Sequence, residues 1–324
     1  MRALLSHEPG PPGSLSLAEI DDPVPGSGEV VVRMEATALN FFDTLIIADL
    51  YQFKPQRPFS PGAEGAGIVE AVGTGVTEVA AGDPVVVFKG HGCCQDKVLV
   101  RADQVFRRPP GLSAEVAAGI VVTYGTTLYA LAGRADLKSG ETLAVLGAAG
   151  GTGLAAVEIG KLMGARVIAC ASSPEKLAVA RAAGADATVD YAGEKLRDRL
   201  KELTGGAGAD VIYDPVGGDL AEQALRGIGW LGRYLVIGFA AGGIPRFPLN
   251  LVLLKGCDIR GVFWGGFLER DPAAHRQNVA TLIDWAAAGR LKPRIDSRTP
   301  LAEARTALER LAAGKVMGKA LIVF

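Results

Sequence analysis

The middle of the chain alternates between short apolar runs and stretches with apolar residues at helical spacing. Thr142–Leu146 predicts a strand, Leu154–Met163 a helix and Val167–Cys170 a second strand. The same alternation continues through strands at Ala187–Val189, Asp210–Asp214 and Arg233–Phe239, with helices at 174–183, 194–203 and 220–228 between them. Repeated strand and helix alternation predicts an α/β fold with a parallel, doubly wound sheet.

The patterns on either side of this region are different. Up to about residue 110, short runs such as Val30–Ala36, Gly67–Gly73 and Pro84–Phe88 are separated by Gly, Pro and Asp clusters, which predicts a compact, barrel-like β domain. After Gly256 we expect a strand at 258–264, helices at 275–288 and 301–312, and a terminal strand at 319–324. The terminal strand is expected to return to the N-terminal domain.

A glycine-rich turn joins the first predicted strand of the α/β region to its helix. It contains the residues Gly147, Ala148, Ala149, Gly150, Gly151, Thr152 and Gly153. Glycines here allow close backbone approach to a ligand, and the free amides at the helix start hold a pyrophosphate. The turn departs from the G-x-G-x-x-G pattern because Ala148 stands at the first glycine position. Its place between a strand and a helix still favours a dinucleotide site, with Ala149–Gly153 as cofactor contacts.

The end of the second strand indicates which dinucleotide is bound. An NAD site places Asp or Glu about twenty residues after the first glycine, where it binds the ribose 2′-hydroxyl. This chain has Ser172 and Ser173 there, followed by Lys176. Two hydroxyls and a lysine favour a 2′-phosphate, and therefore NADPH over NADH. An alternative is that a serine caps the next helix, with Pro174 in its first turn and Glu175 completing a capping box from Ser172; both roles are compatible.

Composition narrows the class of protein. The 324 residues carry a formal net charge of −1 with 21% charged residues, which argues against nucleic acid as a partner. The four cysteines show no zinc or disulfide spacing and are expected to be surface or half-buried free thiols in a reducing compartment, the cytoplasm. The longest uncharged run, Val116–Gly133, contains glycines, threonines and tyrosines and is interpreted as buried core rather than a membrane span.

Several ordered motifs resemble one family along nearly the whole chain. They are Ala38-Leu39-Asn40-Phe41-Phe42-Asp43, Pro61-Gly62-Ala63-Glu64-Gly65-Ala66-Gly67, Val122-Thr123-Tyr124-Gly125-Thr126-Thr127, Ala149–Gly153, Tyr213-Asp214-Pro215-Val216-Gly217 and Gly318-Lys319. The chain resembles the zinc-independent quinone oxidoreductase (zeta-crystallin-like) branch of the medium-chain dehydrogenase/reductase superfamily. This resemblance implies a GroES-like catalytic domain over residues 1–122, a Rossmann domain over 123–267, and a segment over 268–324 that returns to the catalytic domain.

One departure from the wider superfamily concerns its metal. Zinc alcohol dehydrogenases carry a Pro-Gly-His-Glu motif with a histidine ligand, whereas this chain has Ala63 before Glu64, and the position of a catalytic cysteine falls near Asn40. The lobe that binds a structural zinc through four cysteines is missing. Without thiolate and imidazole ligands we expect no catalytic zinc.

The resemblance implies how a metal-free site works. Hydride passes from NADPH to an acceptor that needs little polarisation, such as a quinone or an α,β-unsaturated carbonyl, and the protein supplies mainly proximity and orientation. Catalytic candidates are Asn40, Asp43 and Tyr51. Further cofactor contacts implied by the resemblance are Thr126, Tyr129, Tyr191, Gly238, Phe239, Phe263, Trp264, Gly265 and Lys319, the last near the phosphates.

Two other functions stay open. An acyl-thioester enone is a possible substrate if Lys54 and Arg57 serve a phosphorylated carrier. A redox-sensing or structural protein that holds NADPH with little turnover is the alternative from another class. The family also implies a homodimer, with Gly256–Phe267 as the edge strand that pairs with its copy.

Overall fold

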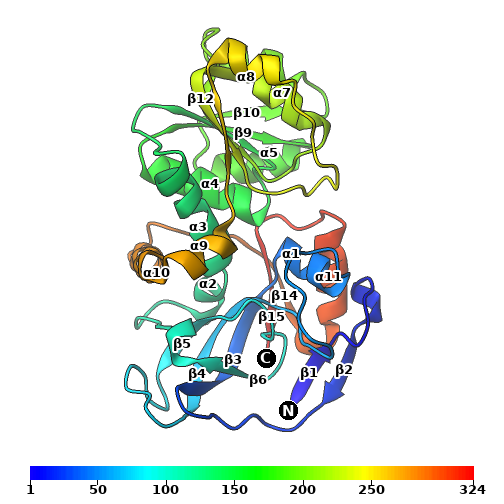
Figure 1. The fold of residues 1–324 in the computed structure, drawn as a ribbon, viewed down its shortest axis with the longest axis vertical. Helices are drawn as coiled ribbons and strands as arrows, with labels where there is room; N and C mark the ends of the chain where they lie inside the picture. Colours follow the sequence, from blue (N-terminus) through cyan, green and yellow to red (C-terminus); the bar gives the residue numbers. More distant parts are fainter. The chain divides into compact units, whose positions relative to one another are not determined.

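The computed structural model describes every residue from Met1 to Phe324 and divides the chain into two compact units. The first unit combines Met1–Thr123 with Val279–Phe324, and the second unit is Tyr124–Asn278 (Figure 1). The first unit is therefore discontinuous in the sequence, and the second unit is inserted into it.

A seven-stranded sheet forms the centre of the first unit. Its strands are β3 (Glu29–Ala38), β4 (Glu64–Val72), β5 (Pro84–Phe88), β6 (Lys97–Arg101), β7 (Val105–Arg107), β14 (Ile295–Pro300) and β15 (Lys319–Val323). They lie in the order β14-β15-β3-β4-β5-β7, with β6 paired to the first half of β3. Strand β3 is thus paired on both edges, and most of its side chains are buried.

The remaining elements of the first unit surround this sheet. They are the ribbon of β1 (Arg2–Leu5) and β2 (Ser16–Glu19), the helices α1 (Phe41–Ile47), α2 (Ala114–Ala118) and α11 (Ala304–Ala312), and the short turns η1 (Pro12–Ser14), η2 (Ala102–Gln104) and η4 (Leu301–Glu303). Leu39, Ile46, Leu308 and Ile322 share one apolar cluster, which joins α1, α11 and β15. The C-terminal strand therefore lies directly beside the start of α1, where the Leu39 amide donates to the Ala320 carbonyl at 3.0 Å.

Six parallel strands form the sheet of the second unit. They are β8 (Thr142–Leu146), β9 (Arg166–Ala171), β10 (Ala187–Asp190), β11 (Ala209–Asp214), β12 (Ile228–Val236) and β13 (Asp258–Gly261), in the order β10-β9-β8-β11-β12-β13. This is the 3-2-1-4-5-6 order of a Rossmann sheet, so the predicted doubly wound fold is confirmed. The strand order reverses between β8 and β11, which is where such folds bind a ligand.

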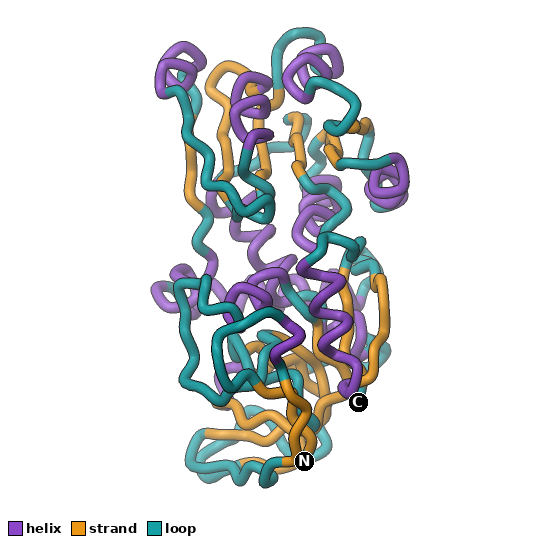
Figure 2. The backbone as a smooth tube through the Cα atoms, turned by 90° about the vertical axis from the view of Figure 1, so that its right-hand side faces the viewer, coloured by secondary structure: helices purple, strands orange, loops and turns teal.

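Helices follow the strands of the second unit in sequence and surround them (Figure 2). They are α4 (Gly151–Leu162), α5 (Pro174–Ala182), α6 (Leu196–Leu203), α7 (Asp219–Gly227), α8 (Leu249–Lys255) and α9 (Trp264–Arg270). Helix α3 (Val121–Leu128) enters the second unit and continues as the π-helix η3 (Tyr129–Arg134), and α10 (Pro272–Ala287) leads back to the first unit. No helix in the chain combines the length and apolar character needed to cross a bilayer.

Three expectations from the sequence need correction. The predicted strand 258–264 ends at Gly261, because Phe263 caps a helix that begins at Trp264. Strand β12 begins at Ile228 rather than at Arg233. All four cysteines are free but buried, not surface or half-buried. For the two strands, a short apolar run was compatible with more than one local structure, and tertiary packing decided between them. For the cysteines, burial depends on packing that the local sequence does not show.

Candidate functional site

The glycine turn of the second unit lies at the carboxyl end of β8. Gly147 takes a positive φ of 58°, and the Gly150 amide donates to the Gly147 carbonyl at 3.0 Å. Helix α4 then begins at Gly151 with no side chain capping its amides. A Cβ at Gly153 would lie only 2.3 Å from the Gly147 carbonyl oxygen, so the helix packs directly on the turn. This geometry fits a pyrophosphate that accepts hydrogen bonds from the free amides.

Polar side chains gather at the end of the neighbouring strand β9. The Lys176 ammonium donates to Ser172 Oγ at 3.2 Å, and the Tyr191 hydroxyl also makes a hydrogen bond with Ser172. The Tyr191 amide donates to the Ala171 carbonyl at 3.1 Å, which holds the start of this loop against the strand end. Ser172, Lys176 and Tyr191 thus form one cluster with a cation and two hydroxyls and no carboxylate among them.

Ser173 caps the helix that follows β9, which is the alternative role that the sequence suggested for a serine here. Its side chain caps α5 by accepting from the Lys176 amide at 3.4 Å, and Pro174 occupies the first helical position. The capping box proposed from Ser172 to Glu175 is not formed, because the cap is one residue later and the Glu175 carboxylate bonds to Ser173. The Ser172 hydroxyl therefore has no capping role, and its side chain contacts the Lys176 ammonium.

The carboxyl end of β11 is shaped by a buried acid. Asp214 accepts from the amides of Val216 and Gly217 at 2.8 and 2.9 Å and from the Tyr234 hydroxyl at 2.5 Å. Burial raises the pKa of this carboxyl, and these three donors oppose that rise. Asp214 therefore fixes the turn after the strand. Gly238 and Phe239 lie against the same turn, since the Gly238 amide donates to the Asp214 carbonyl at 3.3 Å and Phe239 contacts Gly217.

The other expected cofactor residues of the second unit lie on its helices. Thr126 is half-buried on α3, and the Tyr129 ring stacks on Phe267 with centroids 4.2 Å apart. Trp264 is buried close to Gly125, where a Cβ would approach the indole to 3.0 Å, and Gly265 follows it in α9. Phe263 is exposed. Of this group, Trp264 is buried, whereas Thr126, Tyr129, Phe263 and Gly265 keep surface that a ligand can contact.

The first unit holds a separate cluster of buried polar groups. The Lys319 ammonium donates to Asn40 Oδ1 at 2.7 Å and to Glu64 Oε1 at 3.0 Å, and Asn40 Nδ2 donates to Glu64 Oε1 at 3.0 Å. The second oxygen of Glu64 accepts from the Val122 amide at 2.8 Å. We call Asn40, Glu64 and Lys319 the buried triad. It joins β4, β15 and the first residue before α1.

Asp43 lies one helical turn beyond the buried triad. Its carboxylate accepts from the Asn40 amide at 2.7 Å and from the Gly62 amide, so it caps the start of α1. No lysine or arginine contacts it directly, and burial raises its pKa to about 7. Tyr51 is half-buried nearby and stacks on Phe42 with centroids 5.4 Å apart. Burial raises the pKa of its phenol, and the charge of Asp43 adds to this, so Tyr51 is a hydroxyl donor at neutral pH.

The structure changes the interpretation of two residues in this cluster. Lys319 is expected near the cofactor phosphates, but its ammonium is enclosed by Asn40 and Glu64 within the first unit. Glu64 was given no role, although it accepts three hydrogen bonds and is fully buried. In the sequence, the only signal for Glu64 is its place at the end of the Pro-Gly-x-Glu motif.

The residues of the chain do not fit a metal ion. No group of three or more His, Cys, Asp or Glu side chains is arranged to hold one. Ala63 stands where the motif of zinc alcohol dehydrogenases has its histidine, the position of their catalytic cysteine falls near Asn40, and Lys319 brings an ammonium to Asn40. Burial also raises the pKa of the thiols of Cys93 and Cys94, which disfavours the thiolate form that zinc requires.

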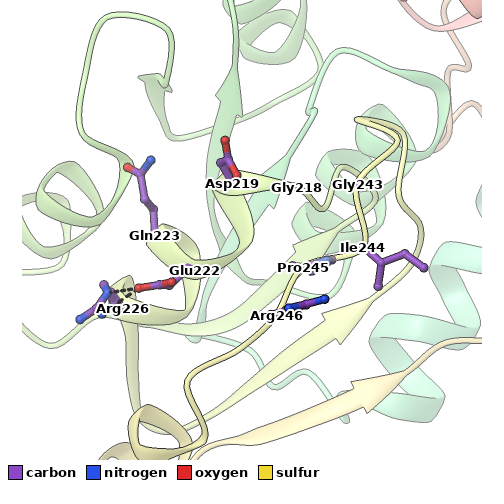
Figure 3. A pocket seen from close by; sticks show the side chains of 9 residues that line it. All are labelled: Gly218, Asp219, Glu222, Gln223, Arg226, Gly243, Ile244, Pro245 and Arg246. Atoms are coloured by element: carbon purple, nitrogen blue, oxygen red, sulfur yellow. Dashed lines mark hydrogen bonds and ion pairs between the residues drawn. The ribbon is translucent and has the colours of Figure 1, made fainter.

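A hollow of about 480 Å³ lies beside the start of α7. It is lined by Gly218, Asp219, Glu222, Gln223, Arg226, Gly243, Ile244, Pro245 and Arg246. Figure 3 shows Arg226 joined to Glu222 along one wall, an ion pair with an N–O distance of 2.7 Å. None of the expected site residues lines this hollow, so it is not part of the candidate site.

Comparison with known families covers most of the chain. Residues 26–127 match the alcohol dehydrogenase GroES-like domain, and residues 151–288 match the family described as zinc-binding dehydrogenase. The first match covers most of the β-rich N-terminal part, and the second runs from the start of α4 through α10.

Individual relatives agree with these matches. A quinone oxidoreductase-like protein 2 homolog of Nematostella vectensis is 38% identical over 301 residues, which are 92% of this chain and 82% of the relative. A quinone oxidoreductase of Pseudomonas aeruginosa is 34% identical over 316 residues, which are 97% of each chain. The crystal structure of Escherichia coli quinone oxidoreductase complexed with NADPH superposes with a TM-score of 0.92, at 30% identity and over the whole of both chains.

Proposed function

The chain belongs to the zinc-independent quinone oxidoreductase branch of the medium-chain dehydrogenase/reductase superfamily, and from this premise we propose that it is an NADPH-dependent reductase of quinones or α,β-unsaturated carbonyls. The observation that carries the proposal is the contact between Lys176 and Ser172 at the end of β9. A cation and hydroxyls in that place suit the 2′-phosphate of NADPH, whereas the ribose of NADH is normally bound by a carboxylate.

Each part of the second unit has a role in holding this cofactor. The amides that begin α4 would bind the pyrophosphate, and Ser172, Ser173, Lys176 and Tyr191 would hold the 2′-phosphate. The loop at Gly238–Phe239, together with Thr126, Tyr129 and Phe263–Gly265, contacts the nicotinamide half. Bound NADPH supplies the hydride. The binding energy is used to orient the cofactor, which is the main contribution that a metal-free site makes.

The first unit supplies the groups that face the acceptor. Reduction of a quinone or an enone adds one hydride and one proton, so negative charge collects on an oxygen before the proton arrives. We assign the Tyr51 hydroxyl as the hydrogen-bond donor to that oxygen, because burial and the nearby Asp43 carboxylate keep the phenol protonated. Asn40 and Asp43 hold the start of α1, and Phe42 in this helix stacks on the Tyr51 ring.

Tyr51→Phe is expected to lower kcat/KM by tenfold or more, a loss of about 1.4 kcal/mol of transition-state stabilisation. Phenylalanine keeps the stacking on Phe42, so the change removes only the hydroxyl. Steady-state kinetics with one quinone and one enone measure the effect, and the Kd of NADPH serves as the internal control. An unchanged kcat/KM would remove Tyr51 from the mechanism.

The two alternative functions have less support. Lys54 and Arg57 do not offer free charges to a phosphorylated carrier, because Lys54 pairs with Asp49 at 2.8 Å and Arg57 bonds to the Ile47 carbonyl at 2.9 Å. This disfavours an acyl-thioester substrate. A redox-sensing or structural protein does not require a partly buried hydroxyl donor, and its thiols would have to be accessible, whereas all four cysteines are buried. Free, buried thiols are also consistent with the cytoplasm that we propose as its compartment.

NADPH oxidation followed at 340 nm against a panel of quinones and enones tests the proposed function. We expect turnover with NADPH, little with NADH, and no loss of rate after treatment with a metal chelator. Competition by free coenzyme A is expected to be absent. NADPH binding without turnover on any acceptor would favour the structural alternative, a preference for NADH would contradict the role of Ser172 and Lys176, and inactivation by the chelator would contradict the metal-free reaction.

We also propose that the protein is a homodimer formed through the second unit. Strand β13 is an open edge of the sheet, and several exposed apolar side chains surround it: Trp230, Leu231, Leu249, Leu253, Leu254 and Ile259. Leu253 is 79% exposed and Trp230 is 70% exposed, although most residues of these types are buried in proteins. Pairing of two β13 edges would satisfy the open ladder and cover this surface.

Light scattering is expected to give twice the 33.5 kDa mass of the chain. Leu253→Asp places a charge in the proposed interface and is expected to weaken dimerisation at least tenfold, by about 1.4 kcal/mol. Val24→Asp is the matched control, since Val24 is 82% exposed in the first unit, and it should leave the mass unchanged. A wild-type monomer at micromolar concentration would refute the interface.

A further inference from the structure

The buried triad in the first unit is a closed arrangement of three side chains. Lys319 is 3% exposed, Asn40 is 5% exposed and Glu64 is not exposed at all. Each pair among the three is joined by a hydrogen bond of 2.7 to 3.0 Å. An ammonium only donates and a carboxylate only accepts, so the Asn40 amide fits between them in a single orientation. Both amide hydrogens are used, because Nδ2 also donates to the Ala38 carbonyl at 3.3 Å.

The surroundings of Lys319 are built to bring its ammonium to this place. The aliphatic stem passes over Gly119, where an added Cβ would approach the lysine Cγ to 3.2 Å. Strand β15 fixes the backbone of Lys319 by pairing with β14 and β3. The ammonium therefore stands beside Asn40 and Glu64, the residue that follows Ala63 in the chain. A fixed internal cation thus lies at the motif that carries a histidine in zinc alcohol dehydrogenases.

We propose that Lys319 is a positioning residue of the reductase site, whose ammonium acts as the fixed positive charge that holds the Asn40 amide, the Glu64 carboxylate and the start of α1 in one arrangement. The ammonium donates to these two side chains inside the first unit and is 3% exposed, so we assign it no contact with the substrate. Its role is to hold the Glu64 carboxylate directly and, through Asn40, the start of α1 with the Asp43 carboxylate.

The effect on the reaction passes through α1 and rests on the proposed function. Asn40 precedes the first residue of α1, and Asp43 caps that turn through the Asn40 amide. Phe42, in the same turn, supports the ring of Tyr51. A rotation of the Asn40 side chain would move the helix start, and with it the hydroxyl that we assign as donor to the acceptor oxygen. Loss of the ammonium should therefore slow turnover without touching the cofactor site of the second unit.

Asp43 reports on the charge of Lys319. The titratable groups that act on or around Asp43 are Lys319 from β15, Glu64 from β4, Tyr51 after α1, and the thiols of Cys93 and Cys94 in the loop before β6. Lys319 is the only cation among them, and its charge lowers the pKa of Asp43 against the effect of burial. Removing the ammonium should therefore raise the pH at which Asp43 titrates.

The test compares Lys319→Met and Lys319→Arg with Lys315→Met, which changes an exposed lysine just before β15. We expect Lys319→Met to lower kcat at least tenfold, to change the Kd of NADPH less than twofold, and to move the Asp43 midpoint upward in carboxyl-carbon NMR. Lys319→Arg keeps the charge and should restore the Asp43 midpoint. Lys315→Met should match the wild type in all three measurements. If Lys319→Met does not fold, the double variant Lys319→Met with Glu64→Gln removes both charges and should fold with the same low kcat.

The proposal would be overturned if Lys319→Met left either the kcat or the Asp43 midpoint unchanged. It would also be overturned if the double variant kept the wild-type kcat. Failure of the proposed function is separate, since it would show as no turnover by the wild type on any acceptor. In that case the NMR measurements decide alone: the Asp43 midpoint and the side-chain amide signals of Asn40 must both change in Lys319→Met for the positioning role to stand.

Discussion

Gly153→Ala is expected to raise the Kd of NADPH by about 100-fold, or roughly 2.7 kcal/mol of binding energy. The new methyl group would lie 2.3 Å from the Gly147 carbonyl oxygen and 2.8 Å from the Ala148 Cα, and both are backbone atoms. No side-chain rotation relieves such contacts, so the turn has to move away from α4. The amides that begin α4 then lose the spacing that binds a pyrophosphate. Fluorescence titration with NADPH measures the change.

Gly160→Ala is the matched control, seven positions after Gly153 on the same helix. Its Cβ would meet Leu143 at 2.7 Å and Val167 at 3.2 Å, which are core side chains. We expect this variant to lose thermal stability but to bind NADPH normally. Equal losses of NADPH affinity in the two variants would show that destabilised packing of α4, and not the geometry of the turn, explains the Gly153 result.

Asp43→Asn is expected to change how stability depends on pH. The pKa of Asp43 is about 7 in the folded protein and 3.8 without the fold. Because the folded value is raised, the stability that this group contributes is complete below about pH 3.8 and is lost as the pH rises through about 7. The difference corresponds to about 4 kcal/mol at most. The variant has no such loss, so its stability relative to the wild type should increase between pH 4.5 and 8.

Urea unfolding at several pH values measures this difference. The decisive quantity is how the difference in unfolding free energy between variant and wild type changes with pH. Asparagine also places an amide N–H where the carboxylate accepts from Gly62, and this lowers the stability of the variant by the same amount at every pH. Asp21→Asn changes an exposed aspartate of the same unit and serves as the control. A constant difference between Asp43→Asn and wild type at every pH would contradict the raised pKa. We also expect Asp43→Asn to have a lower kcat. The buried charge of Asp43 would then lower the stability of the protein but contribute to the reaction.

The elements near the glycine turn were predictable because their signals are local. The strand before Gly147, the helix after Gly151 and the pair Ser172 and Lys176 all lie within about thirty residues, and period and turn chemistry describe such segments well. The structure places Ser172 and Lys176 in contact, and their role toward NADPH stays a prediction that the NADH control tests. The Rossmann strand order follows from the same alternation.

The buried triad was not predictable in this way. Lys319 and Asn40 are separated by 279 positions, and nothing in the sequence around either one indicates the other. Lys319 looked like a surface cation suited to a phosphate, since lysine is almost never fully buried unless it is paired. Its partners are supplied by strand pairing, when β15 comes to lie beside β3. Tertiary structure, not local pattern, determines the role of this residue.

The pairing of β15 with β3 also constrains the order of folding on the ribosome. Strand β3 emerges early, but the neighbour that covers its second half is made only after the whole of the second unit. At typical rates of synthesis this delay is on the order of ten seconds or more, during which that edge of β3 is open. The second unit is continuous in sequence and can fold during the same interval. The nascent chain therefore passes through a stage in which the second unit is folded and the sheet of the first unit is unfinished, which is a target for chaperones.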